Sequence, residues 1–127
     1  MSPPAPDRLL DKEWLLARYR GDAEFVKEVY LVFLQDAPAK LDRLVQALAS
    51  RLAPDQGAGR EEAAAIPAAA HALKGMLATI GASQAAELAA RVEKAARADE
   101  LDQARALLPE LSGVFDAVMA AARAETA

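Results

Sequence analysis

Apolar side chains recur along this chain every three to four residues, and they never alternate every second residue as in a β-strand. An α-helix gathers residues at this spacing on one face, which can then be buried against other helices. Alanine, the strongest helix former, is abundant, while glycine is scarce inside the periodic stretches. We therefore predict an all-α fold, an antiparallel up-down four-helix bundle with an additional short N-terminal helix.

The expected helix boundaries follow from capping and turn residues. Four side chains are predicted to cap the N-termini of helices: Asp11, Asp22, Ser83 and Asp99. The third helix is expected from about Glu61 to Ile80, with Gly81 as its C-terminal cap. Residues 53–59 concentrate turn-forming residues and are expected to form the clearest internal loop. We expect residues 1–8 to be a disordered or frayed tail, and residues 9–125 to form a single domain, which the length of 127 residues allows.

The helical periodicity also predicts which side chains form the core. In the second helix these are Phe25, Val26, Val29, Val32 and Phe33, and beyond Pro38 they are Leu41, Leu44, Val45, Leu48 and Leu52. Because the second set is rotated around the helix relative to the first, Pro38 is expected to bend or interrupt the helix. The last helix is predicted to bury Leu101, Leu108, Leu111, Val114, Phe115 and Val118.

The composition argues against several classes of function. The chain has no cysteine and one histidine, which excludes disulfides and leaves little for a metal site. A net charge of −4 without basic clusters argues against a nucleic-acid partner. No apolar run approaches the roughly 20 residues that span a bilayer, and the start of the chain does not resemble a signal peptide. We expect a cytoplasmic protein, monomeric and without a membrane partner.

The single histidine lies on an unusual helix face. On a helical wheel, His71 points away from Leu73 and Leu77 on the core side, and Lys74 and Gly75 follow it by three and four residues. Four further residues with little bulk share this face: Ala64, Pro67, Ala68 and Ala78. Glycine costs about 1 kcal/mol relative to alanine in a helix interior, which suggests that the missing side chain lets another molecule approach. We interpret this face as a docking face.

The chemistry of this face favours phosphoryl transfer. An imidazole has an unperturbed pKa near 6.5, so at neutral pH its free ring nitrogen is a competent nucleophile that can attack phosphorus. An ammonium group one helical turn away, on Lys74, can neutralise the oxygens of the transferring group.

These residues resemble a known family. His71-Ala-Leu-Lys74-Gly75, followed by Ile80-Gly81-Ala82, resembles the His-x-x-Lys-Gly signature of histidine-containing phosphotransfer (HPt) domains of multistep phosphorelays. The similarity extends to Phe33 and Pro38-x-x-Leu41 upstream, and to Leu88-x-x-x-Val92-Glu93-x-Ala95-Ala96 downstream. Met76 departs from the family, which often has a small hydroxyl residue there, and the helical wheel places it near the core boundary.

The resemblance implies a function. His71 matches the phosphoacceptor, Lys74 the phosphate-contacting residue, and Gly75 the small position that admits a receiver domain. Such domains are phosphocarriers without kinase activity of their own, and they exchange phosphoryl groups with receiver domains of response regulators or hybrid histidine kinases. No cofactor is expected on this chain, because magnesium is supplied by the receiver. The receiver is expected to dock over the third helix and the adjoining helix that carries Phe33.

Two other functions compete with phosphotransfer. A helical adaptor could bind a receiver domain or a histidine kinase without transferring phosphoryl groups. Alternatively, His71 could act as the general base of a hydrolase, which requires a carboxylate or serine nearby. The helix face that carries His71 offers neither, and we therefore rank the hydrolase last. The Arg, Lys and Glu residues of the fourth helix, Glu93 among them, are expected to form a solvated surface.

Overall fold

The computed structural model describes residues 4, 9–50 and 60–127, and this part of the chain is built from α-helices without strands. The helices are α1 (Lys12–Arg18), α2 (Ala23–Ser50), α3 (Arg60–Thr79), α4 (Ser83–Arg97) and α5 (Leu101–Thr126). The predicted all-α class is thus confirmed over the described residues. The predicted loop at 53–59 and Leu52 lie outside them, as does most of the predicted tail at 1–8.

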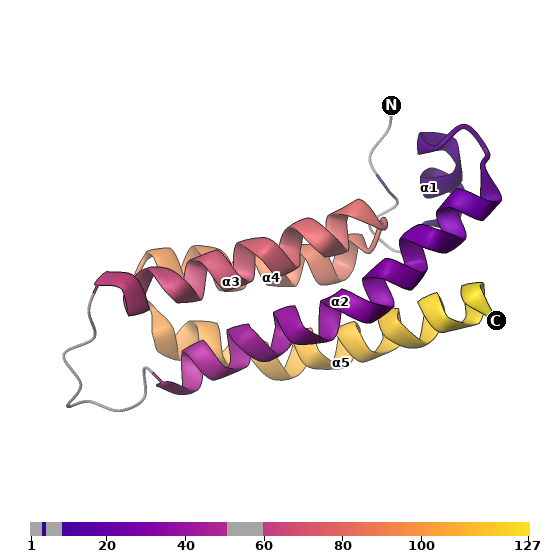
Figure 1. Cartoon of the computed structure of the whole chain (residues 1–127). Coiled ribbons are helices and arrows are strands. Elements are labelled where there is room, and N and C mark those ends of the chain that lie inside the picture. The colour runs from indigo at the N-terminus through magenta and orange to yellow at the C-terminus, as the bar shows by residue number, and fades with distance from the viewer. Residues whose placement is uncertain (1–3, 5–8, 51–59) are drawn as a thin grey trace.

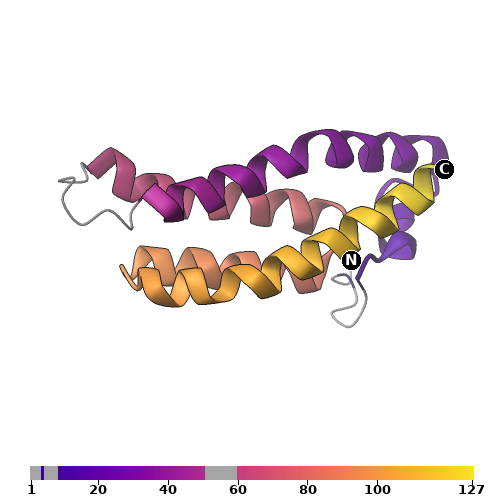
Figure 2. The ribbon, with the colours of Figure 1, turned by 90° about the horizontal axis from the view of Figure 1, so that it is seen from below.

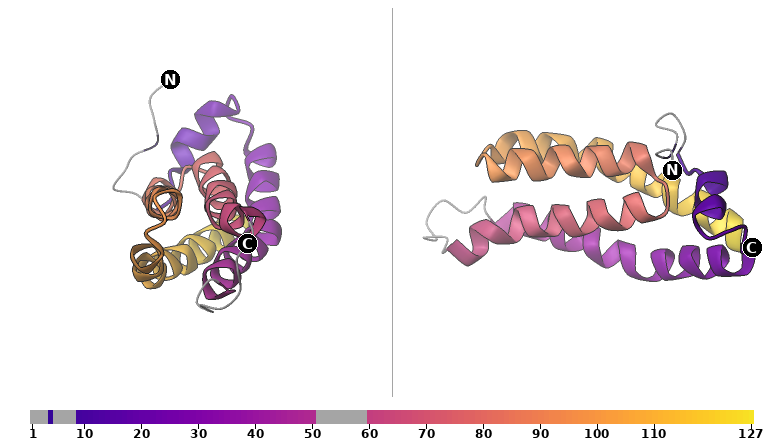
Figure 3. Two further views of the ribbon diagram at one scale, coloured as in Figure 1. Left: turned by 90° about the vertical axis from the view of Figure 1, so that its left-hand side faces the viewer. Right: turned by 90° about the horizontal axis from the view of Figure 1, so that it is seen from above.

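The four long helices lie side by side, and each runs opposite to the one before it in the chain (Figure 1). α2 packs against α3, α3 against α4, and α4 against α5, while α5 returns to α2. Seen from the end, the four helices occupy separate corners around a common core (Figure 3, left). The short helix α1 lies across the end of this assembly where α2 begins and α5 ends (Figure 2).

The core is filled mainly by aliphatic side chains, with one aromatic pair between α2 and α5. The rings of Phe33 and Phe115 lie 6.3 Å apart and are tilted by 55°. Alanine contributes fully buried positions on α2, α3, α4 and α5, which lets the helices approach closely. None of the described helices has the length and apolar character needed to cross a membrane.

The predicted core face of α2 is partly wrong. Val26 and Phe33 are buried as predicted, but Phe25 is 47% exposed and Val32 is 52% exposed. The buried face is completed instead by Tyr30 and Ala37, which the prediction left out. Tyrosine carries a polar hydroxyl and alanine has a small side chain, so neither residue was included among the predicted core residues. Both nevertheless lie on the buried face of α2. Farther along α2, Val45 is likewise 39% exposed.

The three prolines inside helices do not divide them. α2 continues through Pro38 as one helix. Of the two outcomes predicted for Pro38, a bend or an interruption, the interruption is therefore wrong. α3 and α5 similarly contain Pro67 and Pro109. In α5, Leu111, Phe115 and Val118 are buried as predicted, while Leu101, Leu108 and Val114 pack partly buried against the core.

The helix caps confirm some predicted boundaries and correct others. Asp11 accepts a hydrogen bond from the backbone N–H of Trp14, and Asp22 accepts one from Phe25, as expected of N-caps. Gly81 has a positive φ of 78° just beyond α3, as predicted. The predicted caps Ser83 and Asp99 are wrong by one residue each, because the N-cap positions are occupied by Ala82 and Glu100.

The turns between helices explain this one-residue error. After α3, the amide of Ala82 donates to the carbonyl of Leu77, and the amide of Gly81 donates to Ala78. Asp99 and Glu100 repeat the pattern after α4, where Asp99 has a φ of 58°. In this arrangement the residue with positive φ, Gly81 or Asp99, belongs to the C-terminal turn of the preceding helix. The residue that follows it, Ala82 or Glu100, is then the N-cap of the next helix. Asp99 therefore ends α4 instead of capping α5.

Candidate functional site

His71 lies in α3 with its ring directed to the surface. Its side chain is 63% exposed, whereas Leu73 and Leu77 of the same helix are fully buried. This orientation agrees with the helical wheel. The ring is therefore accessible to another molecule, while the helix that carries it is fixed by its buried face.

A carboxylate from the neighbouring helix contacts the ring. His71 Nδ1 lies 3.1 Å from Glu93 Oε2 and 3.3 Å from Oε1. Glu93 belongs to α4, and its side chain is only 9% exposed. The expectation that Glu93 lies on a solvated surface is therefore wrong.

Glu93 collects three positively charged or protonatable groups. Lys74 Nζ lies 2.9 Å from Oε1, and Arg97 donates to Oε2 from Nη2 at 2.7 Å and from Nε at 3.1 Å. Together with His71 Nδ1, these contacts use both carboxylate oxygens. The spacings explain the convergence, because Lys74 follows His71 by one turn of α3, and Arg97 follows Glu93 by one turn of α4.

The ion pairs keep the Glu93 carboxyl ionised. Burial alone would raise its pKa, because a buried carboxylate loses hydration. The hydrogen bonds from Lys74 and Arg97, with the charges of Lys74 and His71, outweigh burial and lower the pKa of Glu93 from 4.5 to about 2. Glu93 is consequently a carboxylate at neutral pH and can only accept hydrogen bonds.

An acceptor at Nδ1 determines the tautomer of the neutral ring. Because the Glu93 carboxylate cannot donate, the contact becomes a hydrogen bond only when Nδ1 of His71 carries the proton. The lone pair of the neutral imidazole is then on Nε2, at the far side of the ring. This arrangement resembles the way a carboxylate orients the catalytic histidine of a Ser-His-Asp triad, and it leaves Nε2 available as a nucleophile.

Gly75 lies in open space, as predicted from its position. A Cβ atom built at Gly75 would meet no atom within 4 Å. The side chains of Ala64, Ala68 and Ala78 are exposed on the same helix. The prediction for Pro67 is wrong in one respect, because Pro67 is buried and so offers no surface to a partner. Pro67 precedes Lys74 by seven residues, about two helical turns, and therefore lies on the same side of α3 as Lys74, which contacts Glu93 of α4.

An apolar patch adjoins this face on the side of α2. It consists of Phe25, Val29, Val32 and Met76, and a cavity of about 290 Å³ opens between these side chains. Phe25 stacks obliquely on Tyr19, with ring centroids 4.8 Å apart. Met76 is partly buried and packs against the core, as its position on the helical wheel predicted. We call this surface the α2–α3 apolar patch.

The described residues give no metal site of their own. Over 9–50 and 60–127, no three His, Cys, Asp or Glu side chains come together as metal ligands would. The carboxylate of Glu93 is instead surrounded by cationic partners, which compete with any metal ion.

Glu93 is the site residue that the sequence interpretation missed. A helical wheel shows the neighbours of His71 within α3, but it does not show which residue of α4 lies beside the ring. The available signal was its position on α4, because Glu93 follows the buried Val92 and lies four residues before Arg97. A carboxylate beside a buried stripe can be reached by partners on two helices.

Comparison with protein families agrees with this geometry. The model of the Hpt domain family matches residues 28–125, and the chain therefore belongs to this family. No curated protein and no solved structure matches the chain significantly. Hpt domains serve phosphorelays as histidine phosphotransfer modules without kinase activity of their own, and they interact with receiver domains and kinases. Helix α1 and the start of α2 precede the matched range.

Proposed function

We propose that this chain accepts a phosphoryl group on His71 from the aspartyl phosphate of one receiver domain and passes it to the aspartate of another. The observation that carries the proposal is the contact between His71 Nδ1 and the ionised Glu93. This contact favours the tautomer whose lone pair is on Nε2, and the exposed side chain leaves the ring open to a partner.

The transfer step follows from this tautomer. The Nε2 lone pair attacks phosphorus, the bond from phosphorus to the acyl oxygen breaks, and the receiver's aspartate leaves as a carboxylate. The product is a phosphoramidate at Nε2, and Nδ1 keeps its proton. Glu93 offsets the positive charge that develops on the ring during attack. In the reverse direction, the carboxylate of the next receiver attacks phosphorus and the Nε2 lone pair is restored.

Lys74 can serve the phosphoryl group without leaving Glu93. Its ammonium has three donors, and the contact with Glu93 Oε1 at 2.9 Å requires one of them. The remaining donors are available to the phosphoryl oxygens, whose negative charge must be offset during transfer. We assign the magnesium ion of the reaction to the partner receiver domain.

The receiver is proposed to dock over the exposed face of α3 and the α2–α3 apolar patch. Gly75, Ala68 and Ala78 leave the backbone of α3 open around His71. The exposed Phe25 and Val32 give a partner apolar area to bury beside it. The docking helix pair is the one expected from the sequence, and a monomer leaves this surface free.

The test is transfer from a phosphorylated receiver domain in the presence of magnesium. The wild-type chain should acquire an acid-labile, alkali-stable label, and the variant H71Q should acquire none. K74Q should transfer at least about tenfold more slowly, which corresponds to roughly 1.4 kcal/mol of lost charge stabilisation. The matched control is K94Q, which removes an exposed lysine of α4 outside the site. A label that persists in H71Q would refute the assignment of His71.

The same assay separates the competing functions. A non-transferring adaptor would bind a verified phosphorylated receiver but acquire no label. The hydrolase alternative was ranked last because no carboxylate was expected near His71, and Glu93 removes that reason. Among the described residues, however, the hydrogen bonds of the His71 side chain go to Glu93, and none joins it to a serine or threonine hydroxyl. A hydrolase of the serine type would need that contact.

A further inference from the structure

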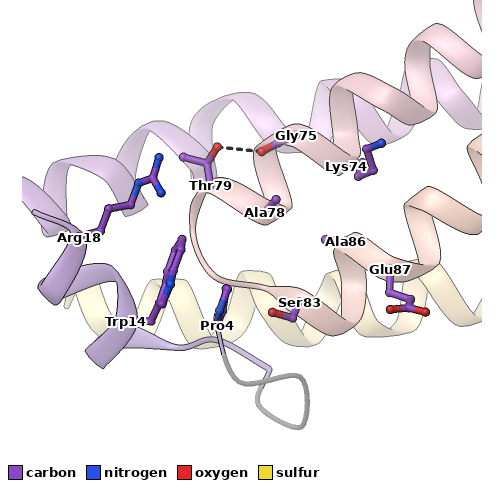
Figure 4. Close-up of a pocket in the computed structure, with 10 residues that line it drawn as sticks. All are labelled: Pro4, Trp14, Arg18, Lys74, Gly75, Ala78, Thr79, Ser83, Ala86 and Glu87. Atoms are coloured by element: carbon purple, nitrogen blue, oxygen red, sulfur yellow. Dashed lines mark hydrogen bonds between the residues drawn. The ribbon is translucent and has the colours of Figure 1, made fainter. Parts of the chain in front are cut away.

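A groove extends from the site toward the N-terminal helix. It has a volume of about 560 Å³, and Lys74 and Gly75 of α3 lie on its wall. The opposite wall is formed by Trp14 and Arg18 of α1 (Figure 4). The groove is therefore continuous with the surface on which a receiver would dock, yet it includes a helix that the family match does not cover.

Three charged side chains line the groove: Arg18 at the α1 end, and Glu87 and Lys74 toward the other end, where Lys74 is already paired with Glu93. Figure 4 shows Arg18 at the α1 end and Glu87 of α4 at the other end. The Arg18 guanidinium lies over the ring of Trp14, 5.5 Å from its centroid. Within the described part of the chain neither Arg18 nor Glu87 forms an ion pair, and both are exposed. Between them the lining is mainly apolar, with Trp14, Ala78 and Ala86.

The α1 wall is held in place by the turn after α3. The backbone N–H of Asp11 donates to the carbonyl of Gly81 at 3.2 Å. A Cβ built at Gly81 would lie 3.1 Å from Cε3 of Trp14, so the indole packs directly on this glycine. Leu15 is fully buried. These contacts fix Trp14 and Arg18 relative to Lys74, so that α1 can act as part of one surface with the site.

We propose that this groove selects among receiver domains by the order of charges on the segment that enters it. The preferred segment carries a carboxylate opposite Arg18, an apolar side chain against Ala78 and Ala86, and a cation opposite Glu87. The inference rests on the proposed function, because the occupant is the receiver that exchanges phosphoryl groups with His71. Charge pairs of this kind raise association rates and disfavour partners with the opposite order.

The decisive variant reverses both charges at once. The double substitution R18E/E87K leaves the net charge of the chain unchanged, so long-range attraction to a receiver is preserved while the local order of charges is inverted. The matched control, D116K/R123E, inverts two exposed charges of α5 that do not line the groove. Purified receiver domains from the source organism, each phosphorylated beforehand, serve as probes.

We expect R18E/E87K to lower kcat/KM at least tenfold for the receiver that the wild type prefers. The loss should reside mainly in KM and should shrink at high salt, which screens exposed charges. For receivers with the opposite order of charges, the kcat/KM of R18E/E87K should rise relative to its kcat/KM for the receiver that the wild type prefers. D116K/R123E should keep the wild-type order of preference. An unchanged order of preference in R18E/E87K would overturn the proposal.

A small phosphoryl donor distinguishes this outcome from a failure of the phosphotransfer function itself. Phosphoramidate has no surface to dock. Its P–N bond breaks, ammonia leaves and a new P–N bond forms at His71, so R18E/E87K should be labelled at the wild-type rate. If the wild type is labelled by no receiver, the proposed function fails. If receivers label the wild type and R18E/E87K keeps the wild-type order of preference among receivers, the groove proposal alone fails.

Discussion

At the scale of single residues, Glu93 links the two helices of the site through one carboxylate. It contacts His71 and Lys74 from α3 and Arg97 from its own helix. A buried charge is tolerated in a protein only when it is paired and hydrogen-bonded, and here two of the three partners, His71 and Lys74, are also groups that the proposed reaction uses. The same contacts that stabilise the fold therefore orient the nucleophile.

The ion pairs of Glu93 make the free energy of unfolding depend on pH in the acidic range. The pKa of Glu93 is lowered from 4.5 to about 2 in the folded protein, so its ion pairs contribute fully above about pH 4.5. The contribution is lost as the pH falls from 4.5 through 2. At about 1.36 kcal/mol per pKa unit, it amounts to at most about 3 kcal/mol. We expect E93Q to lower the free energy of unfolding by up to this amount at pH 7, measured by urea denaturation.

The pH profile separates this effect from a packing defect. Glutamine has the shape of protonated glutamate, so the difference in unfolding free energy between wild type and E93Q should shrink toward zero near pH 2. E87Q, which changes an exposed glutamate of the same helix, should follow the wild-type curve throughout. A difference for E93Q that stays constant from pH 7 to pH 2 would contradict the assigned role of the ion pairs.

At the scale of the helices, the apolar periodicity predicted which segments are helical better than it predicted which side chains are buried or contact another helix. All described helices were expected, because repeated apolar spacing and the caps Asp11 and Asp22 are local properties of the chain. Glu93 was misplaced because its partners come from another helix. Phe25 and Val32 were misplaced because both are apolar residues on the exposed side of α2, where the fold leaves an open patch. Such features depend on which helices meet, and the periodicity of one helix does not contain that information.

Substitutions of three glycines can show whether a position matters for stability, for phosphotransfer or for both. Gly75 and Gly113 lie inside α3 and α5, and a Cβ at either would meet no atom within 4 Å. G75A and G113A should each raise the free energy of unfolding by about 1 kcal/mol. G81A should lower it by at least about 1 kcal/mol, because Gly81 has a positive φ and a Cβ there would crowd Trp14 and Asp11.

Phosphotransfer should separate the two stabilising substitutions. G75A adds a methyl group to the surface that a receiver approaches beside His71, so transfer should slow despite the gain in stability. G113A, on α5, should transfer as the wild type does. Thermal or urea unfolding and transfer rates from one phosphorylated receiver provide both measurements. Equal transfer by G75A and the wild type would show that Gly75 is not required for docking.

At the scale of the whole molecule, the packed helices form a support from which the side chain of His71 projects into solvent. α3 and α4 pack extensively against each other, and each buries core side chains, among them Leu73 and Leu77 of α3 and Ala89 and Val92 of α4. A phosphoryl group added at Nε2 projects outward from a ring that is already 63% exposed, so no core contact has to change. Two receivers acting in opposite directions can then use the same surface, because the platform is the same before and after transfer.

We therefore expect phosphorylation of His71 to leave the bundle unchanged. In ¹H–¹⁵N spectra, shifts should be confined to residues around His71, Lys74, Glu93 and Arg97, with those of α5 and the core positions of α2 unaffected. The free energy of unfolding should change by less than about 1 kcal/mol, the range of an exposed charge interaction. Widespread shifts in α5 would mean instead that the phosphoryl group alters the packing of the bundle. A receiver could then sense phosphorylation through a change in shape, whereas a rigid bundle requires it to contact the phosphorylated ring directly.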